Sequence, residues 1–324
     1  MSEAPMDSMA ESSGTRGPTH TEFAPWYDLS MPYREVMPSP AQRDEDAPRT
    51  SDQLRVAAER AYCAGDLTSA MQLAAAAGAG YREVNDEWGT ADALALCGAI
   101  ARCARDWPTA VEYYREALSA FTIVDDLSSA ARVYRSLAEA FFTAGDFDEA
   151  AAVLHEGLTV LPDDPVLLSG LGYSLWYAGH EADALAHLNR ALAVDPDNRA
   201  ALFARGQIHA DLGRPRLALA DLDRLRGCAN DEAHRRADLK SARGISLIAL
   251  GRTADGEAEL EDALLLVPHR ARTQRRVAEA RLREGDTERA RIALHAAVTS
   301  PQPLPSAHAD RARRLLRRMP SATV

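Results

Sequence analysis

The stretch Leu167–Asn198, "LLSGLGYSLWYAGHEADALAHLNRALAVDPDN", decides the fold of this chain. Apolar residues recur at three- and four-residue spacing on both sides of Gly179, which predicts two helices joined by a tight turn. A glycine at the turn adopts the positive φ that ends the first helix. Gly172 and Ala184, on either side of the turn, are small enough for the two helix backbones to approach closely. Pro196 stops the second helix.

The same pattern recurs along the chain. The turn residues are Gly65, Arg105, Gly145, Gly179, Gly213, Gly251 and Gly285, at intervals of 40, 40, 34, 34, 38 and 34 residues. A glycine or alanine stands seven residues before each turn, and another stands five residues after it. Repetition at this period indicates an array of helix-turn-helix units over residues 51–300.

These residues resemble the tetratricopeptide repeat (TPR) family. The resemblance implies an all-α fold, a right-handed superhelical α-solenoid of about seven TPR helix-turn-helix units plus a C-terminal capping helix. Three positions depart from the family pattern: Arg105 replaces the turn glycine, Leu225 a small residue and Gly256 an alanine. The 40-residue units predict helices that are longer by most of a turn each.

In this family the first helix of each unit lines a concave groove, and the resemblance carries the groove positions onto this chain. It implies an exposed apolar strip over the four central units, formed by Phe142, Tyr173, Trp176, Tyr177, Phe203, Ile245 and Ile248. Charged positions flank the strip at both ends: Arg132 and Arg135 precede it, and Arg272 and Arg275 follow it.

An exposed apolar patch with a polar rim typically marks a binding surface. We therefore expect a peptide-binding groove that holds an extended apolar or aromatic segment, or an amphipathic helix, whose acids meet Arg132 and Arg135. A slip in the assumed register would instead place the same rings in the core between units.

Residues 1–50 form an acidic, proline-rich tail with 7 of the 17 prolines and 9 acidic against 4 basic side chains. Such a composition predicts disorder. Residues 22–38, "EFAPWYDLSMPYREVMP", are unusually aromatic for a linker. This segment is a candidate docking motif, with Phe23, Trp26, Tyr27, Leu29 and Tyr33 as its anchors. It binds either in the groove of its own chain or as a patch against the first helices.

Residues 301–324 predict a basic capping helix and tail. Between Arg270 and Arg318 there are 13 arginines and 5 acidic residues. The capping helix is expected to cover the end of the array with a polar face; docking of an acidic partner on this basic end is the alternative.

Composition excludes several classes of protein. The net charge of -11 makes nucleic acid an unlikely partner. An acidic N-terminus without an apolar run, and no apolar run of membrane-spanning length, predict a soluble, cytoplasmic protein without membrane contact. The composition suits a high-GC bacterium. No pattern predicts a particular oligomeric state.

The motifs of known chemistries are missing from the sequence. We find no phosphate-binding loop, nucleophile elbow or zinc-protease motif, and the four cysteines form no metal-binding spacing. The sequence therefore predicts no enzyme activity, no metal and no cofactor. The expected function is a protein-protein interaction module: an adaptor, a chaperone-like protein or a regulator. The alternatives are a ligand- or peptide-sensing regulatory TPR protein that acts through a partner, and a secretion chaperone.

Overall fold

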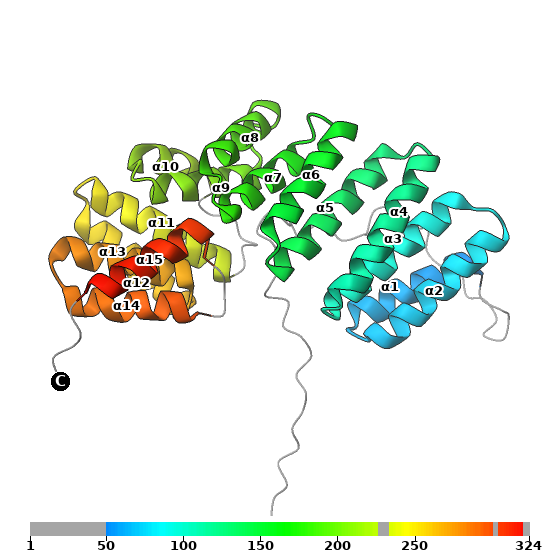
Figure 1. Ribbon diagram of the computed structural model, residues 1–324, viewed down its shortest axis with the longest axis horizontal. Helices are drawn as coiled ribbons and strands as arrows, with labels where there is room; N and C mark the ends of the chain where they lie inside the picture. The colour runs from blue at the N-terminus through cyan, green and yellow to red at the C-terminus, as the bar shows by residue number, and fades with distance from the viewer. Residues whose placement is uncertain (1–49, 226–232, 301–303, 320–324) are drawn as a thin grey trace, which may run out of the picture.

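The computed structural model describes residues 50–225, 233–300 and 304–319. Within these ranges the chain forms fifteen α-helices and one 3-10 helix, arranged as a curved array of stacked helix pairs (Figure 1). The predicted all-α solenoid is confirmed. The tail and its docking motif at residues 22–38 lie outside the described residues.

Seven helix pairs follow one another along the arc. They are α1 (Ser51–Cys63) and α2 (Leu67–Glu83), α3 (Glu87–Cys103) and α4 (Trp107–Ile123), α5 (Leu127–Ala144) and α6 (Phe147–Val160), α7 (Pro165–Ala178) and α8 (Glu181–Val194), α9 (Arg199–Asp211) and α10 (Pro215–Leu222), α11 (Ala233–Ala249) and α12 (Thr253–Leu266), and α13 (Ala271–Glu284) and α14 (Thr287–Thr299). The short η1 (Asp223–Leu225) extends α10, and α15 (Ser306–Arg318) covers α14.

The turn within each pair is built from local sequence. All seven turn residues have a positive φ, including Arg105 at 61°, where a glycine is usual. An aspartate follows several of these turns, and the side chains of Asp66 and Asp106 accept hydrogen bonds from backbone N–H groups in the first turn of the next helix. The 40-residue spacing corresponds to helices of 17 or 18 residues from α2 to α5, against 14 in α7 and α8.

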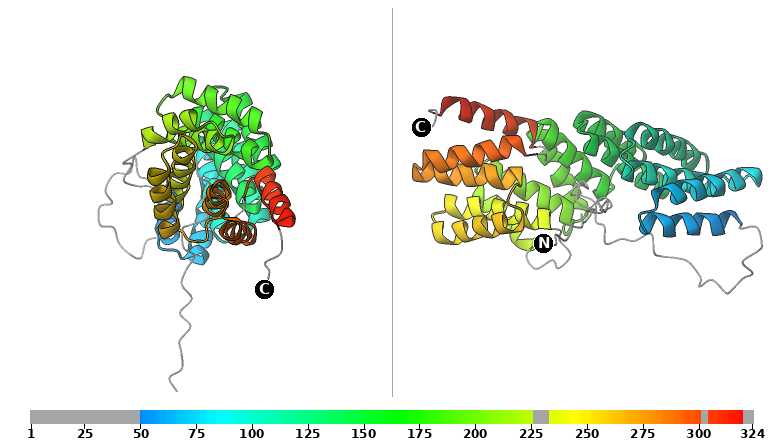
Figure 2. Two further views of the ribbon diagram at one scale, coloured as in Figure 1. Left: turned by 90° about the vertical axis from the view of Figure 1, so that its left-hand side faces the viewer. Right: turned by 90° about the horizontal axis from the view of Figure 1, so that it is seen from below.

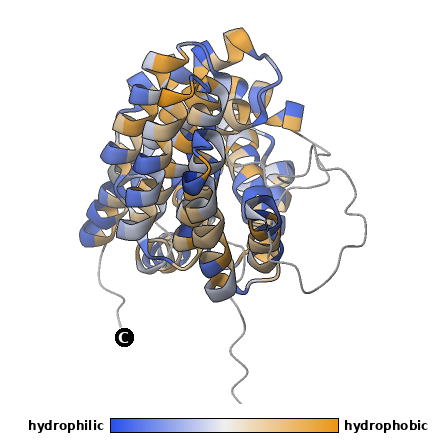
Figure 3. Ribbon diagram, turned by 90° about the vertical axis from the view of Figure 1, so that its right-hand side faces the viewer, coloured by the Kyte–Doolittle hydropathy of each residue, from blue (hydrophilic) through white to orange (hydrophobic). Residues whose placement is uncertain are grey.

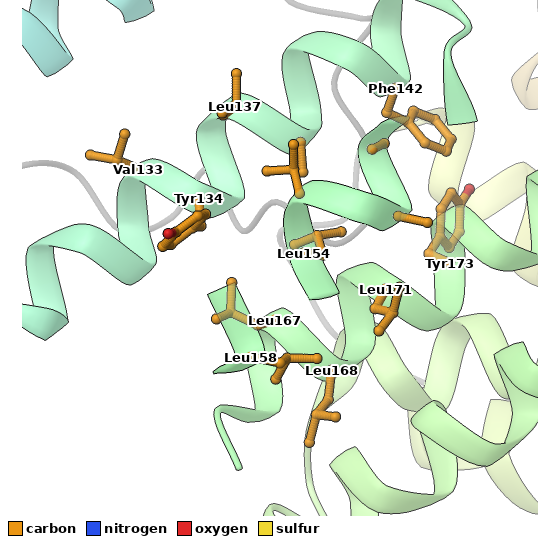
Figure 4. Packing of buried hydrophobic residues seen from close by; sticks show 14 of the residues in the cluster. Val133, Tyr134, Leu137, Phe142, Leu154, Leu158, Leu167, Leu168, Leu171 and Tyr173 are labelled. Carbon is orange, nitrogen blue, oxygen red and sulfur yellow. The ribbon is translucent and has the colours of Figure 1, made fainter. Parts of the chain in front are cut away.

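The core lies between the helix layers. Figure 4 shows apolar side chains of α5, α6 and α7 converging, among them Leu137, Leu154 and Leu171. Small residues set the helix spacing, since a Cβ added to Gly172 meets Leu188 Cγ at 2.6 Å. Seen from the N-terminal end, the helices carry hydrophilic and hydrophobic residues on different sides (Figure 3). In the described part of the chain no helix has the length and apolar character needed to cross a membrane.

We expect Gly172→Ala to destabilise the array. Overpacking costs about 1–3 kcal/mol, which exceeds the gain of roughly 1 kcal/mol in helix propensity. Gly78→Ala is the matched control, because its new Cβ meets only Ala93 Cβ at 3.4 Å, an ordinary contact. Urea unfolding followed by circular dichroism should give a lower midpoint for the first variant and an unchanged or higher one for the second. Equal midpoints would contradict the close approach of α7 and α8.

Candidate functional site

The rings predicted to line an open groove are buried. Tyr173, Trp176 and Tyr177 of α7 are at most 4% exposed, and Phe142 of α5 is 8% exposed. The expectation of an exposed apolar strip was therefore wrong. The rings pack on one another: the centroid of Phe142 lies 5.4 Å from that of Tyr173 and 4.8 Å from that of Tyr177. Each separation is typical of attractive aromatic pairs.

The cover over these rings includes a guanidinium group from the seventh pair. Arg272 of α13 lies 4.5 Å from the ring centroid of Trp176 and 4.6 Å from that of Tyr177, close enough for cation–π attraction. Its Nη2 donates a hydrogen bond to Tyr173 Oη at 3.0 Å, and its Nη1 donates to Asp238 at 3.2 Å. Burial lowers the pKa of Arg272 and raises that of Tyr173.

Two further arginines of α13 meet an aspartate at the end of α9. Arg276 donates to Asp211 Oδ1 at 2.9 Å and to Gln207 at 2.6 Å, and Arg275 donates to the same carboxylate. All three charged side chains are at most 3% exposed. Burial alone raises the pKa of a carboxyl group, but the guanidinium groups of Arg275 and Arg276 hold the pKa of Asp211 below its usual range.

A second aspartate joins the sixth and seventh pairs. The Asp238 carboxylate of α11 accepts two hydrogen bonds from Arg270, at 2.9 and 2.6 Å, besides the one from Arg272. Its side chain is 1% exposed. Because three donors converge on it, the negative charge is compensated although water is excluded.

The capping helix contributes a histidine. His308 of α15 lies 6.3 Å from the ring centroid of Trp176, 3.5 Å from Asp211 and 3.6 Å from Glu181. Figure 2 shows the first turn of α15 directed at the central pairs. Burial and the neighbouring arginines lower the pKa of His308 to about 4, so the ring is neutral near pH 7. We call Asp211, Asp238, Arg272, Arg275, Arg276 and His308 the closing cluster.

The other predicted groove residues also lie in packed surroundings. Phe203 is 4% exposed and has the guanidinium of Arg235 5.7 Å from its ring centroid. Ile245 is 3% exposed and packs in an apolar cluster with Leu260. Ile248 contacts the second helix of its own pair, since a Cβ on Gly256 meets Ile248 Cγ1 at 2.5 Å. The prediction that these three form an exposed strip was wrong.

The predicted arginines at the start of the strip line a cavity. Arg132 is exposed and Arg135 is half-buried, and both face a space of about 370 Å³ between α5 and α7. Leu161, Val166 and Leu167 form an apolar part of its wall, and Asp164 contributes a carboxylate. Two guanidinium groups beside an apolar wall match a ligand that carries both acidic and apolar groups.

The sequence placed two arginines of the closing cluster, Arg272 and Arg275, on the inner face but not against the rings. Arg272 and Arg275 occupy groove positions of the seventh unit, which is three units beyond the fourth unit that carries Tyr173. Stacking of immediate neighbours alone would not bring the two into contact. α13 reaches α7 only because small rotations between successive pairs add up along the array. No local sequence pattern predicts the size of these rotations. Nowhere in the described ranges do three His, Cys, Asp or Glu side chains gather closely enough to hold a metal ion.

Comparison with known proteins gives family matches over most of the array. Models described as tetratricopeptide repeat match residues 89–163, 170–233 and 241–305. A tetratricopeptide repeat protein from Parabacteroides merdae aligns with a TM-score of 0.58 and 17% identity over 82% of this chain and 97% of that one. The apo form of RapI aligns with a TM-score of 0.63 and 15% identity over 82% and 75%. These two likenesses show the fold alone.

Two curated proteins share part of the sequence. Cellulose synthase operon protein C of Xanthomonas axonopodis pv. citri is 31% identical over 144 residues, which is 43% of this chain. DnaJ homolog subfamily C member 3 of Rattus norvegicus is 34% identical over 94 residues, or 29% of this chain. The aligned parts cover only 10% and 18% of those proteins' lengths.

Arg272→Ala is expected to uncover the aromatic cluster and destabilise the chain by about 3 kcal/mol, because it removes one partner of a buried charge. Acrylamide quenching of Trp176, measured after Trp26, Trp88 and Trp107 are replaced by Phe, should increase. Arg289→Ala is the control, since that side chain is 74% exposed. Unchanged quenching in the Arg272 variant would show that this arginine does not seal the rings.

We expect the histidine of the closing cluster to make stability depend on pH. The pKa of His308 is lowered to about 4 in the folded chain, so the unfolded chain binds more protons between about pH 6.5 and 4. The stabilising contribution of the neutral His308 ring is complete above pH 6.5. As the pH falls from 6.5 to 4, the free energy of unfolding decreases by about 3 kcal/mol on account of this group. Unfolding midpoints of the wild type and His308→Gln should therefore converge with falling pH. A constant difference would disprove the neutral, buried state.

Proposed function

We propose a protein-interaction role for this chain, which belongs to the tetratricopeptide repeat family. Family membership supports an interaction module, and the cavity at Arg132 and Arg135 supports a specific mode of binding. In this mode an extended peptide lies along the inner face of α3, α5 and α7. An acidic side chain of the peptide meets the two arginines, and a neighbouring apolar side chain enters against Leu161 and Val166.

The cavity is the observation that carries this proposal, since it combines an exposed positive charge with an apolar wall. Arg132 also donates to Ser129 Oγ at 3.0 Å, which orients its guanidinium group. An anchored arginine loses less side-chain freedom when it binds a carboxylate. The buried aromatic cluster is not needed for this contact, so binding at the cavity does not require the closing cluster to open.

Residues 22–38 of the same chain have the chemistry of such a peptide. They combine five large apolar or aromatic anchors with Glu22, Asp28 and Glu35. Eleven residues lie between Pro38 and Thr50 at the start of α1, and these twelve residue-to-residue steps can span about 40 Å when extended. Successive first helices lie roughly 8–10 Å apart, so α5 is within reach. We propose that this segment occupies the cavity until a partner with similar chemistry displaces it.

A ligand-sensing regulator is the second candidate, and the closing cluster supports it. Arg272 and Tyr173 are 99 positions apart in sequence, and their contact joins the fourth pair to the seventh. A ligand that binds the aromatic rings only after this contact breaks shifts the array toward an open form. Regulatory output in that case passes through a partner protein.

A labelled peptide of residues 22–38 tests the mode of binding. We expect the chain that lacks residues 1–49 to bind the peptide in fluorescence anisotropy, and the full-length chain to bind it more weakly. Arg132→Glu with Arg135→Glu should weaken binding at least tenfold, because each charge reversal replaces attraction with repulsion. Arg115→Glu with Arg236→Glu is the control, because it reverses the same charge at two exposed positions of α4 and α11.

The outcomes test two claims separately: that the cavity binds peptides, and that residues 22–38 occupy it. Equal affinity of both double variants means that the cavity is not the site. If other acidic aromatic peptides bind the shortened chain but residues 22–38 do not, the docking of the tail is wrong and the binding groove stands. Equal affinity of the full-length and shortened chains likewise rules out occupancy by the tail.

A further inference from the structure

Four large apolar side chains protrude from two neighbouring turns, and none of them lines the cavity described above. Val84 and Trp88 flank the α2–α3 turn and are 70% and 46% exposed. Ile123 and Leu127 flank the α4–α5 turn and are 70% and 38% exposed. We call these four side chains the Trp88 knob. Exposed apolar groups gathered in one place are typical of an interaction surface.

The tryptophan of this knob is held in one orientation. Its Nε1 donates to Asp126 Oδ2, the N-cap of α5, at 2.9 Å, and its ring meets the edge of Phe121 at a centroid distance of 6.3 Å. The indole therefore bridges two successive pairs while nearly half of its surface faces solvent. A rigid aromatic group loses little freedom on binding, and tryptophan is enriched among residues that dominate interface energies.

The surroundings of the knob are acidic. Glu83, Glu87 and Asp125 are exposed at the same two turns. Residues 51–160, which form α1 to α6, carry 17 acidic and 8 basic side chains. A partner surface must therefore offer an apolar recess with a positive rim.

A recess of this kind lies on the seventh pair. A space of about 320 Å³ is lined by Leu264 of α12, Val277 of α13 and Ile292 and Ala293 of α14, with Arg281 and Arg289 at its side. Ile292 is 58% exposed, and the Arg289 side chain is 74% exposed. Arg281 is tied to Glu257 and Glu284 at 2.8 Å each, and Arg289 lies 3.5 Å from Asp286. The volume is at the lower end of the range for small-molecule pockets, about 300–1,000 Å³, which admits one indole ring.

The two surfaces lie toward opposite ends of the arc (Figure 1), so one chain cannot join its own knob to its own recess. We propose that the Trp88 knob of one copy inserts into the arginine-rimmed recess of a second copy. The contact is head-to-tail, so each copy keeps one unused knob or recess and further copies add to the ends. Opposite net charges of the two ends favour this orientation over contact between like ends.

Sedimentation velocity over a concentration series tests the proposal. We expect the wild-type chain to form a concentration-dependent series of species that shortens at high salt, because screening weakens the charge attraction. Trp88→Ala and Ile292→Asp should each leave a monomer. Leu217→Asp is the control, since Leu217 is 51% exposed on α10 outside both surfaces and its variant should assemble normally. Circular dichroism confirms that each variant is folded.

A mixture of the two monomeric variants provides the decisive measurement. The intact recess of the Trp88→Ala chain accepts the intact knob of the Ile292→Asp chain, and the mixture should form a dimer that grows no further. A wild-type chain that is monomeric at every concentration overturns the proposal. A mixture that stays monomeric, or assembly that survives Ile292→Asp, shows that the knob binds elsewhere and also overturns it. None of these outcomes depends on the groove that we propose for peptides.

Discussion

The closed form of the array depends on placing the charges of α13 in its interior. Arg272 and Arg276 are among the largest fully buried side chains, and removing a guanidinium group from water costs several kcal/mol. Asp211, Asp238 and the faces of three aromatic rings offset that cost. None of these partners belongs to the α13–α14 pair. These contacts with α7, α9 and α11 therefore hold the seventh pair in position.

This arrangement changes how the solenoid holds together. In an ideal repeat array each unit contacts only its neighbours, and stability is nearly a sum of local terms. Here the contact of Arg272 with Tyr173 and that of His308 with Glu181 join units that are distant in sequence. The first three pairs contribute no residue to the closing cluster, and the cavity at Arg132 and Arg135 lies between the third and fourth pairs.

The sequence predicts the local features of this array well and the contacts between distant pairs poorly. Turns such as Gly179 and Arg105 were predictable, because a positive φ and small residues at fixed spacing are local requirements. The burial of Trp176 was not predictable, because it depends on small rotations summed over the three steps from the fourth to the seventh pair. Ile248 was misplaced for a different reason: Gly256, an exception to the alanine pattern, leaves room for that side chain between the two helices of one pair. One sequence signal could have predicted the contact of Arg272 with the aromatic rings. The seventh unit has arginines at groove positions and the fourth unit has aromatic residues at groove positions, and the two kinds of side chain attract each other.

The two candidate functions make different demands on the closing cluster. A ligand shifts a conformational equilibrium only by the difference between its affinities for the two forms. A peptide that uses only Arg132, Arg135 and the apolar wall beside them meets the same groups whether or not the cluster is intact, so it binds without signalling. A ligand that reaches the face of Tyr177 must displace Arg272, and that arginine then loses its aromatic and carboxylate partners together. Sensing therefore requires contact with the aromatic cluster, whereas a scaffold needs the cavity alone.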